Sequence, residues 1–324
     1  MKSHFLFIAF LSLSISLLAQ YPPPAGMVGT TAIHTDSNIF VSWANQCTFI
    51  AGAVDIKNPS LGLATYGFPE SATGKAEGNA NEVLSLGDGG SATLCFPNGI
   101  RNGEGFDFAV FENSFNDDFL ELALVEVSSD GQNFYRFPSV SLTQTESQVA
   151  TFGTLDATKI HNLAGKYRMG FGTPFDLEDL KNTAGLDINR ITHVRIIDVV
   201  GCIDTEYATR DALQNIINDP YPTAFNTGGF DLDGIGVIHQ ASTGIISKEM
   251  SFVLKVYQLN NVLHIAFDSN KTKMIQLISL NGIVIVSGTS DDNRCEVPLN
   301  SLSHGLYILN MIQGTQVVSK KIIL

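Results

Sequence analysis

The chain has few cysteines, one tryptophan and few basic residues, and it lacks the common catalytic motifs. Its cysteines (Cys47, Cys95, Cys202 and Cys295) are widely separated and form no CxxC pair. The seven histidines show no HxH or HExxH spacing, so the pattern argues against a zinc enzyme. No GxSxG motif occurs, and the glycine-rich run at 87–90 lacks the Lys-Ser/Thr of a phosphate loop. These absences argue against two common classes of enzyme and against P-loop nucleotide binding.

Positive charge is scarce in the middle of the chain. The net charge is −13, and residues 20–244 hold 11 of the 19 basic but 27 of the 32 acidic residues. Such a surface repels phosphate backbones and anionic lipid. We therefore do not expect nucleic acid to be a partner.

Long hydrophobic runs are missing except at the start of the chain. Residues 1–19 combine Lys2, an apolar run from Phe5 to Leu18, and small or apolar residues at Leu17 and Ala19. This is typical of a secretory signal peptide, because the run is too short to span a bilayer. We expect no transmembrane segment elsewhere. Export would permit disulfides, but spacing alone assigns no pair.

What the sequence does contain is a series of alternating apolar and polar residues between glycine-rich turns. This pattern predicts an all-β jelly-roll or related β-sandwich with a few short helices. The strongest predicted strands are Ser91–Phe96, Phe106–Glu112, Leu120–Ser128, Ile191–Val200 and Phe230–Ile238. Short helices are predicted at Asp176–Leu180 and Ala208–Ile217.

A domain boundary is predicted near Gln240. Beyond it the strand pattern restarts, with about six strands in the remaining part of the chain, which suits a small Ig-like β-sandwich. We therefore divide the chain into a signal peptide (1–19), an acidic β-sandwich (20–242) and a C-terminal domain (243–324).

Carboxylates inside apolar runs are candidate metal ligands. In the run from Gly229 to Gly236, alternation places Asp231 and Asp233 on one face of a strand, and Ile235 continues that face. Buried acids need a positive partner, and an acidic pair at a strand end suits Ca²⁺, which takes six to eight oxygen ligands.

The strand Phe106–Asn113 supplies further oxygen ligands. Asp107, Glu112 and Asn113 could complete the calcium shell begun by Asp231 and Asp233. The alternative is structural: Asp231 would cap turn amides, and Asp233 would pair with Arg195.

Aromatic residues on loops form the candidate ligand site. The stiff turn Asp219-Pro-Tyr-Pro-Thr exposes Tyr221, and with Phe225, Tyr207 and Phe171 it could form a shelf for a sugar or a macrocycle. Arg195 is a further candidate contact. The alternative is a loop that packs on the edge of the sandwich.

The C-terminal segment resembles the type A sorting domain of the type IX secretion system. The matching runs are VYQLNNVLHIAF, MIQLISLNGIVIVSG, VPLNSLSHGLYILNMIQG and VVSKKIIL, although Tyr257-Gln-Leu-Asn replaces the usual Tyr-Pro-Asn-Pro opening. The resemblance implies contact with the type IX machinery and export to the outer cell surface, where the domain is removed or attached.

Residues 84–240 resemble a family of bacterial cell-surface proteins. The runs that match are LSLGDGGSATLCF, FDFAVFEN, ELALVEVSSDGQNF, LAGKYRMGFGTPFDL, ITHVRIIDVVG, DPYPT and TGGFDLDGIGVI. The strand pattern is similar to discoidin-like (galactose-binding-like) jelly rolls, which implies binding of glycans or other surface ligands and often a structural calcium. Some relatives are linked to corrinoid (cobalamin) capture.

Together these features predict a secreted, non-catalytic ligand-binding protein, stabilised by calcium, whose ligand is a glycan or a small nutrient such as a corrinoid. One alternative is a carbohydrate-active hydrolase that uses Glu112 and Glu121 as its carboxylate pair. The other is a structural or adhesive surface protein.

Overall fold

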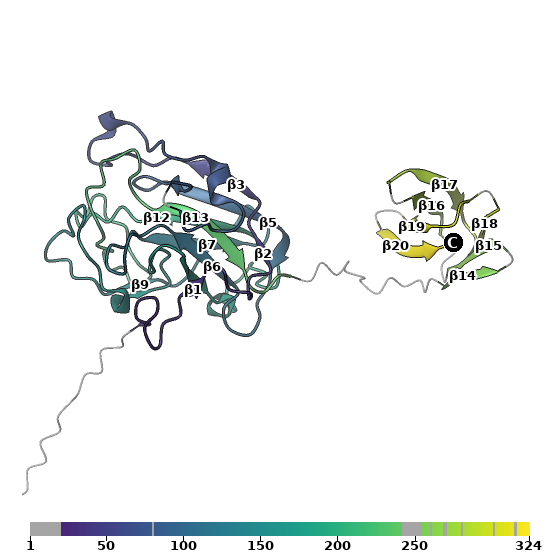
Figure 1. The fold of residues 1–324 in the computed structure, drawn as a ribbon, viewed down its shortest axis with the longest axis horizontal. Coiled ribbons are helices and arrows are strands. Elements are labelled where there is room, and N and C mark those ends of the chain that lie inside the picture. The colour runs from purple at the N-terminus through teal and green to yellow at the C-terminus, as the bar shows by residue number, and fades with distance from the viewer. Residues whose placement is uncertain are drawn as a thin grey trace, which may run out of the picture. The chain divides into compact units, whose positions relative to one another are not determined.

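The computed structural model describes residues 21–79, 81–241, 255–259, 261–267, 271–279, 281–300, 302–313 and 316–324. The predicted signal peptide lies outside these ranges. Contacts divide the chain into Met1–Ser242 and Thr243–Leu324, and each unit is described by itself (Figure 1). Among the described residues, no helix is both long and apolar enough to cross a membrane.

The larger unit is built from two antiparallel sheets and a two-stranded ribbon. The first sheet has the order β1 (Ile33–His34), β11 (Phe171–Phe175), β6 (Phe108–Glu112), β13 (Asp231–Val237) and β2 (Ser42–Trp43), with β4 (Leu84–Ser85) also paired to β13. The second has the order β3 (Gln46–Ile50), β5 (Ser91–Ile100), β12 (Ile191–Asp198), β7 (Ala123–Ser128) and β8 (Tyr135–Arg136). The ribbon pairs β9 (Val140–Ser141) with β10 (Ile160–His161).

The main core lies between the two sheets, which confirms the predicted all-β sandwich. The first sheet contributes Phe108, Val110 and Ile235, and the second contributes Leu94 and Val194, all buried in one cluster. Alternate residues of these strands point to the same face, so a short apolar-polar alternation is enough to build each layer.

Loops cover the other face of the second sheet. Leu124 of β7 and Ile197 of β12 lie next in sequence to main-core residues but belong to a separate cluster with Val149 and Leu155. β7 is therefore buried along its whole length. This second cluster fixes the segment at 149–155, which contributes to the site described below.

Helical structure is confined to short 3₁₀ turns in the described chain, namely η1 (Pro59–Leu61), η2 (Pro69–Ala72), η3 (Ala157–Lys159) and η4 (Leu177–Leu180). The predicted helix at Asp176–Leu180 appears as η4, with the Asp176 carboxylate accepting the Glu178 N–H. The predicted helix at Ala208–Ile217 is wrong. Asp211 instead accepts the N–H groups of Leu213 and Asn215, which closes a turn and competes with helix formation.

The smaller unit is a β-sandwich of its own, as predicted. One sheet has the order β14 (Lys255–Leu259), β15 (Val262–Ala266) and β18 (Arg294–Pro298), and the other has the order β17 (Val284–Ser290), β16 (Lys273–Ser279), β19 (Leu306–Gln313) and β20 (Gln316–Ile323). Leu263 and Ile265 pack with Leu277 and Leu309 between them. All four cysteines of the chain are unpaired thiols.

Candidate functional site

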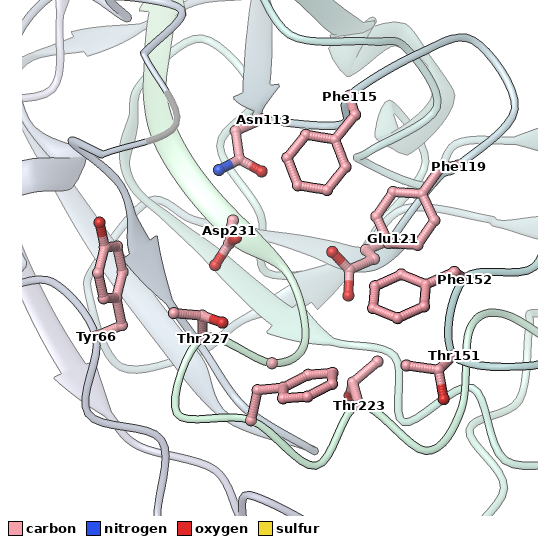
Figure 2. Close-up of a pocket in the computed structure, with 12 residues that line it drawn as sticks. Tyr66, Asn113, Phe115, Phe119, Glu121, Thr151, Phe152, Thr223, Thr227 and Asp231 are labelled. Carbon is pink, nitrogen blue, oxygen red and sulfur yellow. The ribbon is translucent and has the colours of Figure 1, made fainter.

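A pocket of about 390 Å³ opens where β6 ends and β13 begins. Asn113 follows β6 directly, Asp231 opens β13, and Glu121 lies two residues before β7. The loops at 151–152 and 223–228 complete the wall. Figure 2 shows the Glu121 carboxylate directed into this space, with Phe119 and Phe152 on one side and Asp231 on the other.

Phenylalanines form the rim of the pocket. Phe115 stacks on Phe119 at 5.5 Å between ring centroids, Phe119 lies 6.1 Å from Phe152, and Phe152 lies 6.2 Å from Phe225. Phe115 is 68%, Phe152 72% and Phe225 48% exposed. Contiguous exposed aromatic rings are rare on a soluble protein and commonly mark a binding surface. We call these four residues the phenylalanine rim.

Local turn chemistry holds the rim in place. The Asn116 side-chain oxygen accepts the N–H groups of Asp118 and Phe119 at 2.9 and 2.7 Å, which forms an Asx turn between Phe115 and Phe119. The Thr151 hydroxyl donates to the Pro222 carbonyl oxygen at 2.7 Å and so joins the two loops that carry Phe152 and Phe225.

Two carboxylates line the pocket, and one of them has no partner. Asp231 accepts a hydrogen bond from the Ser85 hydroxyl and another from Asn113. Glu121 is only 9% exposed, yet among the residues that the structure describes it forms no hydrogen bond and no ion pair. Glu112 lies behind the lining: one of its oxygens accepts from the Ser114 N–H at 2.8 Å and from the Ser114 hydroxyl, and the other oxygen is buried without a partner.

Burial shifts the protonation of these groups. Desolvation, with the nearby charges of Asp231, Glu112, Asp219 and Asp198, raises the pKa of Glu121 well above its usual value. Desolvation likewise raises the pKa of Asp231 to about 7 and that of Glu112 to about 8. Burial and mutual repulsion both disfavour the ionised forms of these carboxyls, so the pocket end favours either protons or a positively charged occupant.

Asp198 and Asp219 position the strand ends beneath the pocket. Asp198 accepts the N–H groups of Phe230 at 2.7 Å and Gly89 at 2.9 Å, and Asp219 accepts the Leu122 N–H at 2.8 Å. These bonds fix the residues directly before Asp231 and directly after Glu121. Burial raises the pKa of both aspartates well above the usual value.

The structure brings together three of the five predicted calcium ligands. Glu112, Asn113 and Asp231 lie at the pocket end. Asp107 lies at the opposite end of β6, because Phe108 pairs with Val237 and Glu112 with Leu232 in the antiparallel register. There the Asp107 carboxylate accepts the N–H groups of Gly103 and Leu177, both at 2.7 Å, and lies 2.8 Å from His239 Nδ1.

Asp233 is also separate from the pocket. Its carboxylate accepts the N–H groups of Glu77 at 3.1 Å and Gly78 at 2.9 Å. A register irregularity between Leu232 and Gly234 changes the alternation, so Ile235 enters the core with Leu232 and does not continue the aspartate face as predicted. In the described part of the chain, no three His, Cys, Asp or Glu side chains are grouped so as to hold a metal ion.

Of the predicted ligand contacts, only Phe225 lines the pocket. Tyr221 is buried, and its hydroxyl donates to the Asp55 carboxylate at 2.8 Å, so the turn does not expose it as expected. Tyr207 lies beside the Lys57 ammonium, which is 5.6 Å from the centre of its ring.

Phe171 and Arg195 lie away from the pocket. The Arg168 guanidinium covers the Phe171 ring at 4.8 Å. Arg195 forms an ion pair with the buried Glu126, which Arg136 also binds at 2.7 Å. The predicted alternative, a pair between Asp233 and Arg195, is therefore also wrong.

The residues that sequence reasoning missed are Phe115, Phe119 and Phe152. Phe115 and Phe119 flank the acidic run Asn116-Asp-Asp, which was available as a turn signal, whereas nothing in the sequence connects Phe152 to them. The sequence predicts Glu121 only as the partner of Glu112 in a hydrolase, and Glu112 does not line the pocket.

Comparison with known proteins identifies the C-terminal unit. Residues 259–324 match the family model of the secretion system C-terminal sorting domain. The chain thus carries a type IX sorting domain, which interacts with the type IX machinery and directs export to the extracellular space or the cell surface. No curated protein sequence matches the chain.

The solved structures that resemble the chain are distant. A β-glucuronidase from Ruminococcus gnavus in complex with uronic isofagomine is 10% identical, with 94% of this chain and 45% of that chain covered and a TM-score of 0.20. Domains 3 and 4 of rat CD4 are 13% identical, with coverages of 67% and 94% and a TM-score of 0.18. The chain spans less than half the length of the β-glucuronidases it matches. Similarity this low supports no functional conclusion.

Proposed function

We propose that the protein is a non-catalytic ligand-binding module of the cell surface, and that the pocket inside the phenylalanine rim is its binding site. The observation that carries the proposal is Glu121, a carboxylate that is 9% exposed and unpartnered among the described residues, directed into a pocket lined by exposed aromatic rings. A carboxylate this little exposed usually has a protein partner, and one that instead opens only into a concave site is a candidate ligand contact. The sorting domain supplies the surface location.

The predicted ligand classes fit this pocket to different degrees. A volume of about 390 Å³ is at the small end of the range for ligand sites, roughly 300–1,000 Å³. It suits a small nutrient or the terminal sugar of a glycan. A corrinoid is a large macrocycle, and it could insert only one edge or substituent between the rings.

Calcium remains part of the proposal, restricted to the pocket end. Glu112, Asn113 and Asp231 are the predicted ligands that lie there, and one Glu112 oxygen is buried without a partner. Oxygen donors of this kind suit Ca²⁺. Asp107 and Asp233 would take no part, because backbone N–H groups already occupy them.

The experiment is a thermal-shift screen of the full exported chain with oligosaccharides, cobalamin and small nutrients, in calcium and in EDTA. A ligand at 100 times its Kd stabilises the folded state by about 2.7 kcal/mol, which raises the Tm by roughly 5–10 °C. We expect such a shift in the wild type and little shift in Phe152→Ala. The control is Phe106→Ala, which lies just before the other end of β6 and should leave the shift unchanged. Calcium should stabilise the wild type more than Asp231→Asn.

Two outcomes would contradict the proposal. One is the absence of a shift with every ligand. The other is an equal shift in the wild type and Phe152→Ala, which would place the binding site elsewhere.

The hydrolase alternative was predicted with Glu112 and Glu121, but Glu112 does not line the pocket. A hydrolase here would have to use Glu121 and Asp231, the two carboxyls with raised pKa in the lining. Turnover of a bound glycan that is lost in both Glu121→Gln and Asp231→Asn would favour it over binding alone.

A further inference from the structure

The polar groups in the pocket wall are largely occupied. The Thr151 and Tyr66 hydroxyls donate to backbone carbonyl oxygens at 2.7 and 3.3 Å, and the Thr223 hydroxyl donates to Asp88 at 3.5 Å. The Asn113 amide bonds to Asp231. Apart from the Thr227 hydroxyl, the lining side chains thus offer an incoming ligand few free hydrogen-bond donors.

The free groups that remain are acceptors and aromatic faces. The Glu121 carboxylate is unpartnered in the described part of the chain, and Asp231 is the second carboxylate of the lining. The described lining contains no Lys, Arg or His side chain. The ring faces of Phe152 and Phe225 carry partial negative charge, which attracts cations.

We infer that the ligand of this pocket is an organic ammonium ion, whose charged head contacts Glu121 and Asp231 and whose carbon groups contact the phenylalanine rim. The inference rests on the proposed function and names the ligand class for the same pocket. Charge complementarity selects this class, because the site presents two acids and several π faces, which an ammonium group with apolar substituents matches on both counts.

Other ligand classes match only part of the site. A neutral polyol could donate hydroxyl hydrogen bonds to the two carboxylates, but it would leave their negative charge uncompensated, and an anion would be repelled by them. A calcium ion at Glu112, Asn113 and Asp231 would use oxygen ligands alone. Apolar rings would also contribute nothing to its coordination.

The test is calorimetric titration of the full chain with choline and with 3,3-dimethylbutan-1-ol, its neutral carbon isostere of nearly the same shape. We expect choline to bind at least tenfold more tightly than the isostere. Glu121→Gln should weaken choline binding at least tenfold and leave the isostere unchanged. Phe152→Ala, which alters an exposed ring and leaves the core intact, should weaken choline about three- to tenfold and the neutral isostere by less.

A matched control removes a neighbouring charge outside the lining. Asp118 is exposed, and its carboxylate takes no part in the pocket, so Asp118→Asn should change choline affinity less than twofold. A larger loss would show that net charge, and not the site, attracts the cation.

The results separate the two proposals. Equal binding of choline and its isostere, or a shift only with glycans that Phe152→Ala removes, would overturn the ammonium inference and keep the pocket as a ligand site. Calcium binding that excludes choline would also overturn it. Absence of binding by every probe would reject both proposals.

Discussion

The two ends of strand β6 use buried carboxylates in opposite ways. At one end, Asp107 is fully buried, accepts two backbone N–H groups and lies 2.8 Å from His239 Nδ1. At the other end, one Glu112 oxygen has no partner, and the neighbouring Glu121 is unpartnered among the described residues. Both ends remove acids from water, but hydrogen bonds within the protein satisfy Asp107 more completely than Glu112 and Glu121. Asp107 organises loops, whereas under the proposed function the acids of the second end meet a ligand.

The largest expected effect comes from removing the Asp107 carboxylate, which is fully hydrogen-bonded at its end of β6. Asp107→Ala should destabilise the larger unit by about 3 kcal/mol, because it leaves the buried Leu177 N–H and the partly buried Gly103 N–H without an acceptor. Trp43, the only tryptophan, packs 5.3 Å from Phe111 in this unit, so its fluorescence in urea reports this unfolding. A loss of stability below about 1 kcal/mol would show that water replaces the carboxylate and that the two ends of β6 do not differ in this way.

The pH dependence of stability should come from the pocket end. Its carboxyls have pKa values raised in the folded state, to about 7 for Asp231 and about 8 for Glu112. The folded state therefore binds their protons more tightly than the unfolded state. This stabilisation is complete below about pH 4 and is lost as the pH rises through 7 to 8.

We expect urea unfolding, followed by Trp43, to give a free energy of unfolding about 1–3 kcal/mol lower at pH 8.5 than at pH 5. Asp231→Asn should reduce this difference, and saturating calcium should oppose it if the ion occupies the pocket end. Constant stability across this range would mean that these acids are neutralised by other means.

The smallest expected effect comes from the unpartnered acid itself. Glu121→Gln removes the free-energy cost of burying an ionisable group and nearly preserves the shape of the side chain. The free energy of unfolding at pH 8 should therefore stay within about 1 kcal/mol of the wild type or increase. Asp118→Asn should leave stability unchanged. A loss of more than about 2 kcal/mol in Glu121→Gln would show that Glu121 has a structural role like that of Asp107.

The strands could be predicted because each face of the sandwich repeats every second residue. The predicted run Phe230–Ile238 corresponds to β13, and Ile191–Val200 corresponds to β12, with every end within two residues. Alternation is a local property, and it needs no knowledge of which strands pair. Its limit is the irregularity after Leu232, which moves Ile235 to the other face.

The site could be predicted only in part, because it depends on contacts between distant loops. Glu112 and Asp231 stand out in the sequence because they lie inside apolar runs. The antiparallel pairing of β6 with β13 brings both of them to the pocket end of these strands. The same pairing takes Asp107 to the other end, and a five-residue strand is enough to separate the two groups. The phenylalanine rim comes from three separate loops, and a single sequence carries no signal that Phe115, Phe152 and Phe225 meet.

The phenylalanine rim also affects how the displayed molecules behave toward one another. Phe115 and Phe152 are each more than half exposed, 68% and 72%. Exposed apolar surfaces of this kind associate with one another in water. Two molecules displayed close together on a cell surface would therefore be expected to associate through these rings, and a ligand in the proposed pocket would oppose that association by covering them.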